Sequence, residues 1–199
     1  MAQTVRFQVL SKDAVKQNGV VGAAQVISGD RLAHSDPLYH CSLDADFVHS
    51  ARRNVSRAGR SAYETYAELA AVVPAWFDAL MRFRNVGMRA LGMKDLGSLS
   101  SVEPNDEVIP GQRAGIFTVQ SNEFSWLILE DDDKHLRVQL ALWWLRTEGR
   151  DELIVSTVVH VHNALGRAYM VPVAPTHRWI MPLLLRRLNG RSLSRLKVD

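Results

Sequence analysis

The segment from Ala164 to Gly190 constrains the fold most, because it reads as one long amphipathic helix. Its larger apolar side chains recur at a spacing close to 3.6 residues. They are Leu165, Tyr169, Val173, Ile180, Leu184 and Leu188, with Ala168, Trp179 and Leu183 beside them. A helix with one wide apolar stripe needs a surface to cover that stripe, and we expect a β-sheet to provide it.

The ends and the middle of this segment refine the prediction. Asn163 suits the N-cap, because its side chain can accept a hydrogen bond from the first turn. Arg186 and Arg187 lie where the helix dipole favours cations. Pro172 and Pro175 lack the N–H group that a helix interior uses, so they predict a kink or a break.

An antiparallel meander is predicted before the helix, because four strand candidates alternate with turn signals. The candidates are Ala114–Gln120, Phe124–Glu130, His135–Arg146 and Glu152–His162. In the third candidate every second side chain is apolar, which predicts one buried face. That face carries Leu136, Val138, Leu140, Leu142 and Trp144, whereas Arg137 and Gln139 mark the other face.

Two helices are predicted earlier in the chain, one from Ser61 with Glu64 completing a capping box, and one from Pro74. A strand is expected within residues 38–49, and residues 52–60 read as a polar loop. The order of strand, two helices, meander and final helix is typical of an α+β fold. We divide the chain into an arm of uncertain structure (1–36), one folded domain (37–190) and a basic tail (191–199).

Composition excludes several function classes. The net charge of +3 is spread along the chain, so no nucleic-acid partner is expected. Cys41 is the only cysteine, which rules out an internal disulfide. No apolar run reaches the roughly 20 residues of a membrane span, and the first residues lack the layout of a signal peptide. These features predict a cytoplasmic protein with no membrane insertion.

Several short motifs together resemble a bacterial family of domains of unknown function. They are Glu130–Leu136, Ser156–His160, Asn163–Tyr169, Pro175–Arg178, Pro74–Trp76 and Leu80–Asn85. Members of that family occur alone or fused to NmrA-like short-chain reductases. The resemblance implies a helix-grip, START-like fold of the polyketide cyclase (SRPBCC) superfamily, in which a curved antiparallel sheet wraps a long C-terminal helix. It implies no catalytic residues and no cofactor.

Histidines and a carboxylate are the candidates for chemistry. His160 and His162 alternate along a predicted strand, so their imidazoles share one face and could join His135 in a metal site. No third ligand is set by the sequence, so we expect no metal. His135, His160 and Asp133 are the candidate catalytic residues, because an Asp–His pair can act as a general base; the alternative is a solvated turn.

The favoured function is binding of an apolar small molecule between the sheet and the final helix. The expected lining residues are Met88, Trp126, His135, Trp144, Tyr169, His177 and Trp179. One alternative is an enzyme of cyclase, hydrolase or isomerase type that uses a cavity histidine. Another is an interaction domain with a filled core. If Trp143 and Trp144 are both buried, one of them needs a cover from outside the grip, which makes a homodimer a further candidate.

Overall fold

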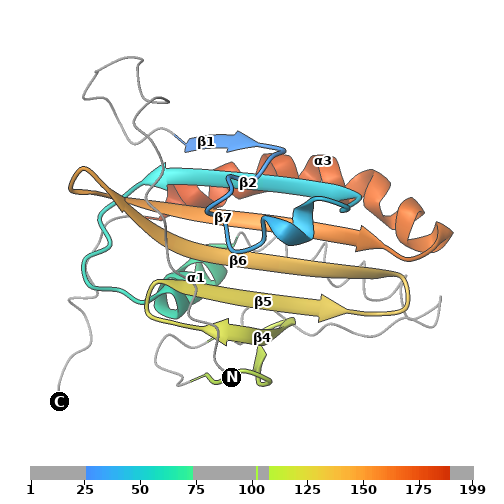
Figure 1. The fold of residues 1–199 in the computed structure, drawn as a ribbon, viewed down its shortest axis with the longest axis horizontal. Coiled ribbons are helices and arrows are strands. Elements are labelled where there is room, and N and C mark those ends of the chain that lie inside the picture. The colour runs from blue at the N-terminus through green and yellow to red at the C-terminus, as the bar shows by residue number, and fades with distance from the viewer. Residues whose placement is uncertain (1–25, 74–101, 103–107, 189–199) are drawn as a thin grey trace.

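The computed structural model describes residues 26–73, 102 and 108–188, and within them seven strands form one antiparallel sheet (Figure 1). The strand order across the sheet is β1-β2-β7-β6-β5-β4-β3. The strands are β1 (Val26–Gly29), β2 (Phe47–Asn54), β3 (Arg113–Ala114), β4 (Phe117–Asn122), β5 (Trp126–Asp132), β6 (Leu136–Thr147) and β7 (Arg150–Val161). The helices are η1 (His40–Ser42), α1 (Ala62–Ala71) and α3 (Ala164–Arg187).

The α+β class, the antiparallel sheet and the C-terminal helix confirm the prediction at this level. The meander of β4 to β7 is present, with each strand within three residues of its predicted bounds. The capping box of α1 is present as well, because Ser61 accepts from the Glu64 N–H and Glu64 accepts from the Ser61 N–H. The helix predicted from Pro74 lies outside the described residues.

The first part of the sheet differs from the prediction. The strand expected within residues 38–49 runs instead from Phe47 to Asn54, so α1 follows the second strand and not the first. Its bounds are decided by pairing with β7, which extends from Phe47 opposite Val159 to Asn54 opposite Glu152. The polar residues Arg52 and Arg53 belong to this strand because each finds a partner outside it, as described below.

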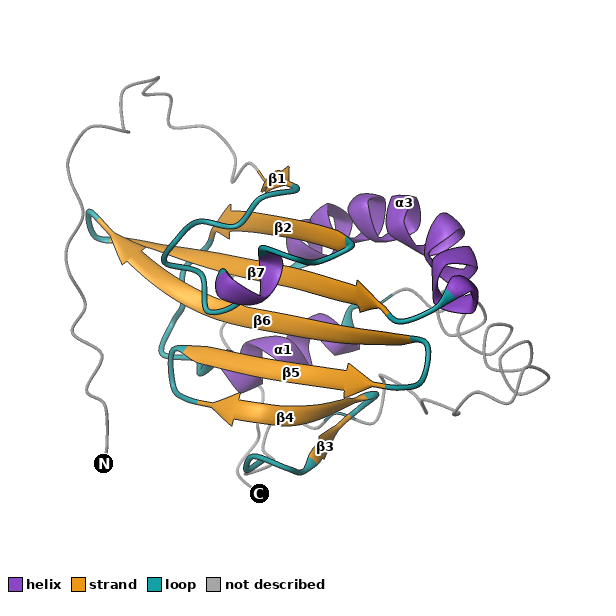
Figure 2. Cartoon of the chain, turned by 45° about the vertical axis from the view of Figure 1, so that its right-hand side comes forward, coloured by secondary structure: helices purple, strands orange, loops and turns teal. Residues whose placement is uncertain are grey.

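The long helix α3 is continuous from Ala164 to Arg187, so the predicted break does not occur. Figure 2 shows that the helix follows a curved path along the sheet. The carbonyl groups that lose an N–H partner to Pro172 and Pro175 belong to Ala168 and Val171, and both of these residues are exposed to solvent. Asn163 is the N-cap as predicted, since its side chain accepts from the Gly166 N–H.

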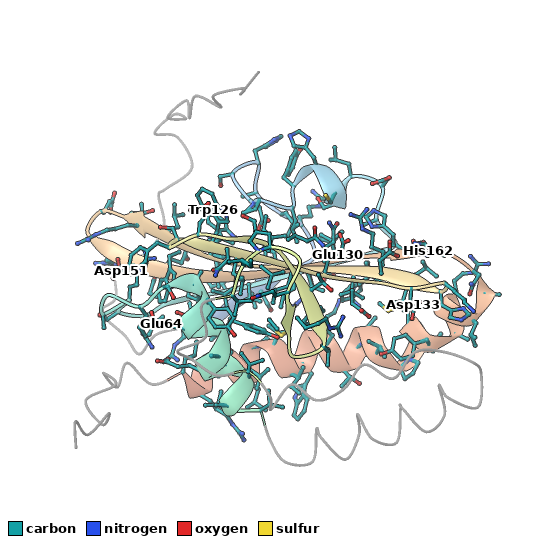
Figure 3. All side chains as sticks on the ribbon, turned by 90° about the horizontal axis from the view of Figure 1, so that it is seen from below. Glu64, Trp126, Glu130, Asp133, Asp151 and His162 are labelled. Carbon is teal, nitrogen blue, oxygen red and sulfur yellow. The ribbon has the colours of Figure 1, made fainter. Side chains whose placement is uncertain are left out.

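The two faces of the sheet have different covers, as Figure 3 shows: α1 and α3 lie on one side, and the segment with η1 lies on the other. We call these the inner face and the outer face. Trp144 is buried on the inner face, and Trp143 is buried on the outer face beside Leu38. The alternation predicted for β6 is therefore confirmed.

The outer cover is fixed by a buried carboxylate. Asp36 accepts hydrogen bonds from the Leu38 N–H (2.9 Å), the Ser156 hydroxyl (2.5 Å) and the Trp143 indole N–H (3.3 Å). Burial raises the pKa of Asp36, and the three donors oppose that rise. Residues of the same chain cover Trp143, so the burial of both Trp143 and Trp144 no longer requires a second copy of the protein.

Arg53 ties the end of α3 to the sheet. Its Nη1 donates to the carbonyl oxygens of Leu185 (2.5 Å), Arg186 (3.1 Å) and Leu188 (2.7 Å). Leu185 and Arg186 belong to the last turn of α3 and Leu188 is its C-cap, so these carbonyls have no partner within the helix. The positive charge of the guanidinium also complements the negative end of the helix dipole.

We expect Arg53→Met to lower the free energy of unfolding by about 2 kcal/mol, because hydrogen bonds to a charged donor are lost at a partly buried helix end. Urea denaturation measures the change. Arg52→Met is the matched control: Arg52 is half exposed and lies 3.7 Å from Glu152, a surface pair worth less than about 1 kcal/mol. Equal losses in the two variants would contradict the capping role of Arg53.

Candidate functional site

The apolar layer between the sheet and α3 is interrupted by a row of polar side chains. On one side of the row is a large apolar cluster that includes Ala51, Val155 and Ile180. On the other side is a small apolar cluster of Phe47, Leu136 and Val159, with Val138, Val161, Tyr169, Met170 and Ala174 packed against it. Between them lie His49 of β2, Thr157 of β7 and His177 of α3, which we call the histidine row.

Backbone pairing and helix position bring the histidine row together. His49 and Thr157 are direct register partners on adjacent strands, so their side chains share the inner face. The Nε2 atom of His177 lies 3.2 Å from the Thr157 hydroxyl. The two imidazole rings are 5.3 Å apart between centroids and nearly perpendicular, and the ring of Phe47 lies 5.6 Å from that of His177.

Each histidine of the row has a buried nitrogen without a hydrogen-bond partner. In both His49 and His177 this atom is Nδ1. Burial, together with the neighbouring His49 and Arg178, lowers the pKa of His177 to about 3. Burial also lowers the pKa of His49, where Asp30 acts in the opposite direction. Both imidazoles are therefore neutral at neutral pH, so each carries one donor and one acceptor nitrogen.

An ion pair flanks the histidine row. The Arg178 guanidinium donates from Nε to Asp30 at 2.9 Å and lies 4.8 Å from the centroid of the Phe47 ring. The positive charge beside the row is thus already matched by a carboxylate. This arrangement gives the row a polar but uncharged character.

Two apolar side chains of the sheet beside the histidine row are only partly buried. Thr157 pairs across the sheet with Leu140 of β6. Leu140 and its inner-face neighbour Val138 are only half-buried, although β6 is central in the sheet. Farther along the same face Leu142 is fully buried. The covering layer is therefore more open over Val138 and Leu140 than over Leu142.

The expected lining residues are distributed over different parts of the molecule. Tyr169 and His177 lie on the sheet-facing side of α3, and Tyr169 packs against the small cluster. Trp144 lies under α1, where its indole N–H is 3.3 Å from the Thr65 hydroxyl. Trp179 is 62% exposed, and Trp126 is 39% exposed at the side of the outer face (Figure 3). Met88 lies outside the described residues.

Asp133 and His135 lie where the β5–β6 hairpin meets the start of α3. The Asp133 carboxylate accepts from the backbone N–H groups of His135 (2.7 Å) and Leu136 (3.1 Å). Nδ1 of His135 lies 3.1 Å from Oδ1 of Asn163, whose side-chain amide donates to the Lys134 carbonyl at 2.8 Å. Both candidates therefore participate in a junction between the hairpin and the helix.

His160 and His162 lie at the same end of the sheet but have separate partners. His160 Nε2 is 3.3 Å from Oδ1 of the exposed Asp44. His162 Nδ1 is 3.0 Å from the carbonyl of Asp133, and Figure 3 shows His162 and Asp133 together at the helix entry. Within the described ranges no three His, Cys, Asp or Glu side chains are placed to hold a metal ion.

Sequence reasoning missed His49 and the role of Thr157. A local signal exists for His49, because it alternates with Phe47 and Ala51 and therefore shares their face once the strand is known. Because the predicted strand lies within residues 38–49 and not at Phe47–Asn54, the sequence analysis does not use this alternation. Thr157 becomes informative only through its pairing with His49 and its contact with His177.

Comparison with known proteins gives one match. A family model described as a protein of unknown function, DUF2867, matches residues 42–184, so the whole histidine row lies within it. No curated protein and no solved structure matches the chain. In the part of the chain that the structure describes, no helix is long and apolar enough to cross a membrane.

Proposed function

Because this chain belongs to the DUF2867 family, whose description names no activity, we propose from the geometry that it binds an apolar small molecule between the sheet and α3. The observation that supports the proposal is the half-buried inner face of β6 at Val138 and Leu140. Small-molecule sites in proteins are mostly apolar, with a few placed polar groups that orient the guest. The histidine row next to Leu140 supplies such groups.

The proposed site therefore has an apolar floor and one polar edge. Leu140 and Val138 contribute the apolar surface of the sheet, and Tyr169 of α3 packs against the same small cluster as Val138. The histidine row forms the polar edge. Trp126 and Trp179 are not included, since one lies at the outer side of the sheet and the other on the exposed side of α3. His135, His160 and Asp133 are also not included, because a structural role accounts for their contacts.

A bulky side chain at Leu140 tests the proposal. We expect wild-type protein to bind the hydrocarbon dye 1,6-diphenylhexatriene with saturable fluorescence, and Leu140→Trp to weaken that binding about tenfold or more, because the indole occupies the floor of the site. The same variant should keep a cooperative thermal transition near that of the wild type. Fluorescence titration and thermal melting measure the two quantities.

Leu145→Trp is the matched control, because Leu145 is half-buried on the same strand but packs in the outer-face cluster. It should leave dye affinity unchanged. A filled core predicts a different result: wild type binds no dye, and Leu140→Trp loses about 1–3 kcal/mol of stability through overpacking. That outcome would replace the binding proposal with the interaction-domain alternative.

A further inference from the structure

We infer that the guest carries an uncharged hydroxyl group, which hydrogen-bonds to Nδ1 of both His49 and His177. This inference rests on the proposed function and specifies the chemical class of the ligand. Its basis is the pair of buried Nδ1 atoms that have no partner, on rings whose centroids are 5.3 Å apart.

The unpartnered nitrogens can accept a partner that enters the layer. A buried polar atom without a hydrogen bond costs about 1–3 kcal/mol, so native structures seldom leave two side by side. His49 is only 2% exposed, and Nδ1 of His177 is buried as well, so bulk water does not satisfy them. A guest group that hydrogen-bonds to both rings would recover this free energy on binding.

A hydroxyl group fits the pair because it is both a donor and an acceptor. A neutral imidazole offers one N–H and one acceptor nitrogen, and the two tautomers let either ring play either part. One ring can therefore donate to the guest oxygen while the other accepts its proton in a hydrogen bond.

A carboxylate fits the pair poorly. It would need donors from both rings and a positive charge nearby, and the lowered pKa values of His49 and His177 disfavour an imidazolium. The charged groups that act on the row are Arg178 and Asp30, and they are paired with each other. Phe47 and Thr157, which contact the row from β2 and β7, are uncharged.

Displacement of 1,6-diphenylhexatriene by 1-decanol and by decanoate at pH 8 tests the inference. We expect decanol to displace the dye from wild type at a concentration about tenfold or more below that of decanoate. His177→Leu and His49→Leu should each weaken decanol binding by about tenfold while the dye still binds, because the dye has no polar group. His177→Asn, whose amide can replace Nδ1, should restore most of the decanol affinity.

The outcomes separate this inference from the proposed function. If wild type binds no dye, the proposed site fails and the inference fails with it. If the dye binds but decanoate displaces it at the same concentration as decanol, the proposed site is retained and the inference of an uncharged hydroxyl group is wrong. If both leucine variants bind decanol as the wild type does, the histidines do not hold the guest, and the inference is likewise overturned. The wild-type comparison does not depend on whether a variant folds.

Discussion

Gly166→Ala should destabilise the protein by about 3 kcal/mol or more, although alanine is normally the better helix residue. A Cβ atom at this position would lie 2.2 Å from the carbonyl oxygen of His135 and 3.0 Å from Cγ1 of Val161. The closest atom is backbone, so relief requires the hairpin and the helix to move apart. The gain in helix propensity is at most about 1 kcal/mol, so the steric cost dominates. Denaturant unfolding measures the change.

Gly29→Ala is the matched control for this variant. A Cβ atom at Gly29 meets no other atom within 4 Å, and the residue belongs to a strand in the same sheet. Its stability should stay within about 0.5 kcal/mol of the wild type. If Gly166→Ala proves equally mild, the close approach of α3 to the β5–β6 hairpin is not a requirement of the fold.

Acid should destabilise the protein through His177. Its pKa lies at about 3 in the folded state, against 6.5 for the free side chain, so the folded state resists protonation. The stability that follows from this difference is fully present above pH 6.5 and is lost as the pH falls toward 3. Since one pKa unit corresponds to about 1.4 kcal/mol, we expect a loss of about 2–3 kcal/mol between pH 7 and pH 4.5. Urea denaturation at the two pH values measures it.

His177→Gln removes the titrating group while keeping a side chain that can contact Thr157. Its stability should therefore depend less on pH over the same interval than that of the wild type. The exposed His162→Gln is the matched control and should reproduce the wild-type profile. An unchanged pH dependence in His177→Gln would show that the acid sensitivity arises elsewhere, for example at the neighbouring His49, whose pKa is also lowered.

Part of the candidate site could be read from the sequence, and part could not. Helical spacing predicts Tyr169 within the apolar stripe of the final helix and His177 near it, and the structure places both on the side of α3 that faces the sheet. That they contact a ligand stays a prediction. Helical spacing predicts Trp179 beside the apolar stripe of the final helix, yet its side chain is 62% exposed. Trp126, also expected to line the cavity, is 39% exposed.

The sequence by itself determined the features that depend on near neighbours in the chain. The meander follows from alternation with a period of two, and the buried side of α3 follows from a period near 3.6. The Asn163 cap and the Ser61–Glu64 capping box are settled within four residues of chain. Each of these features depends on the relative stability of conformations of a short segment, so the residues of that segment determine it.

Only the tertiary structure decided which distant segments meet. The bounds of β2 follow from its register with β7, and the cover over Trp143 depends on Asp36 reaching Ser156, 120 positions away. The histidine row draws on β2, β7 and α3. Such contacts form only when the whole sheet closes in one register, and a shift of one residue would turn His49 to the other face. The physical reason is that the pairing of distant strands depends on how much apolar surface the whole folded state buries, and no short segment of the sequence determines that amount.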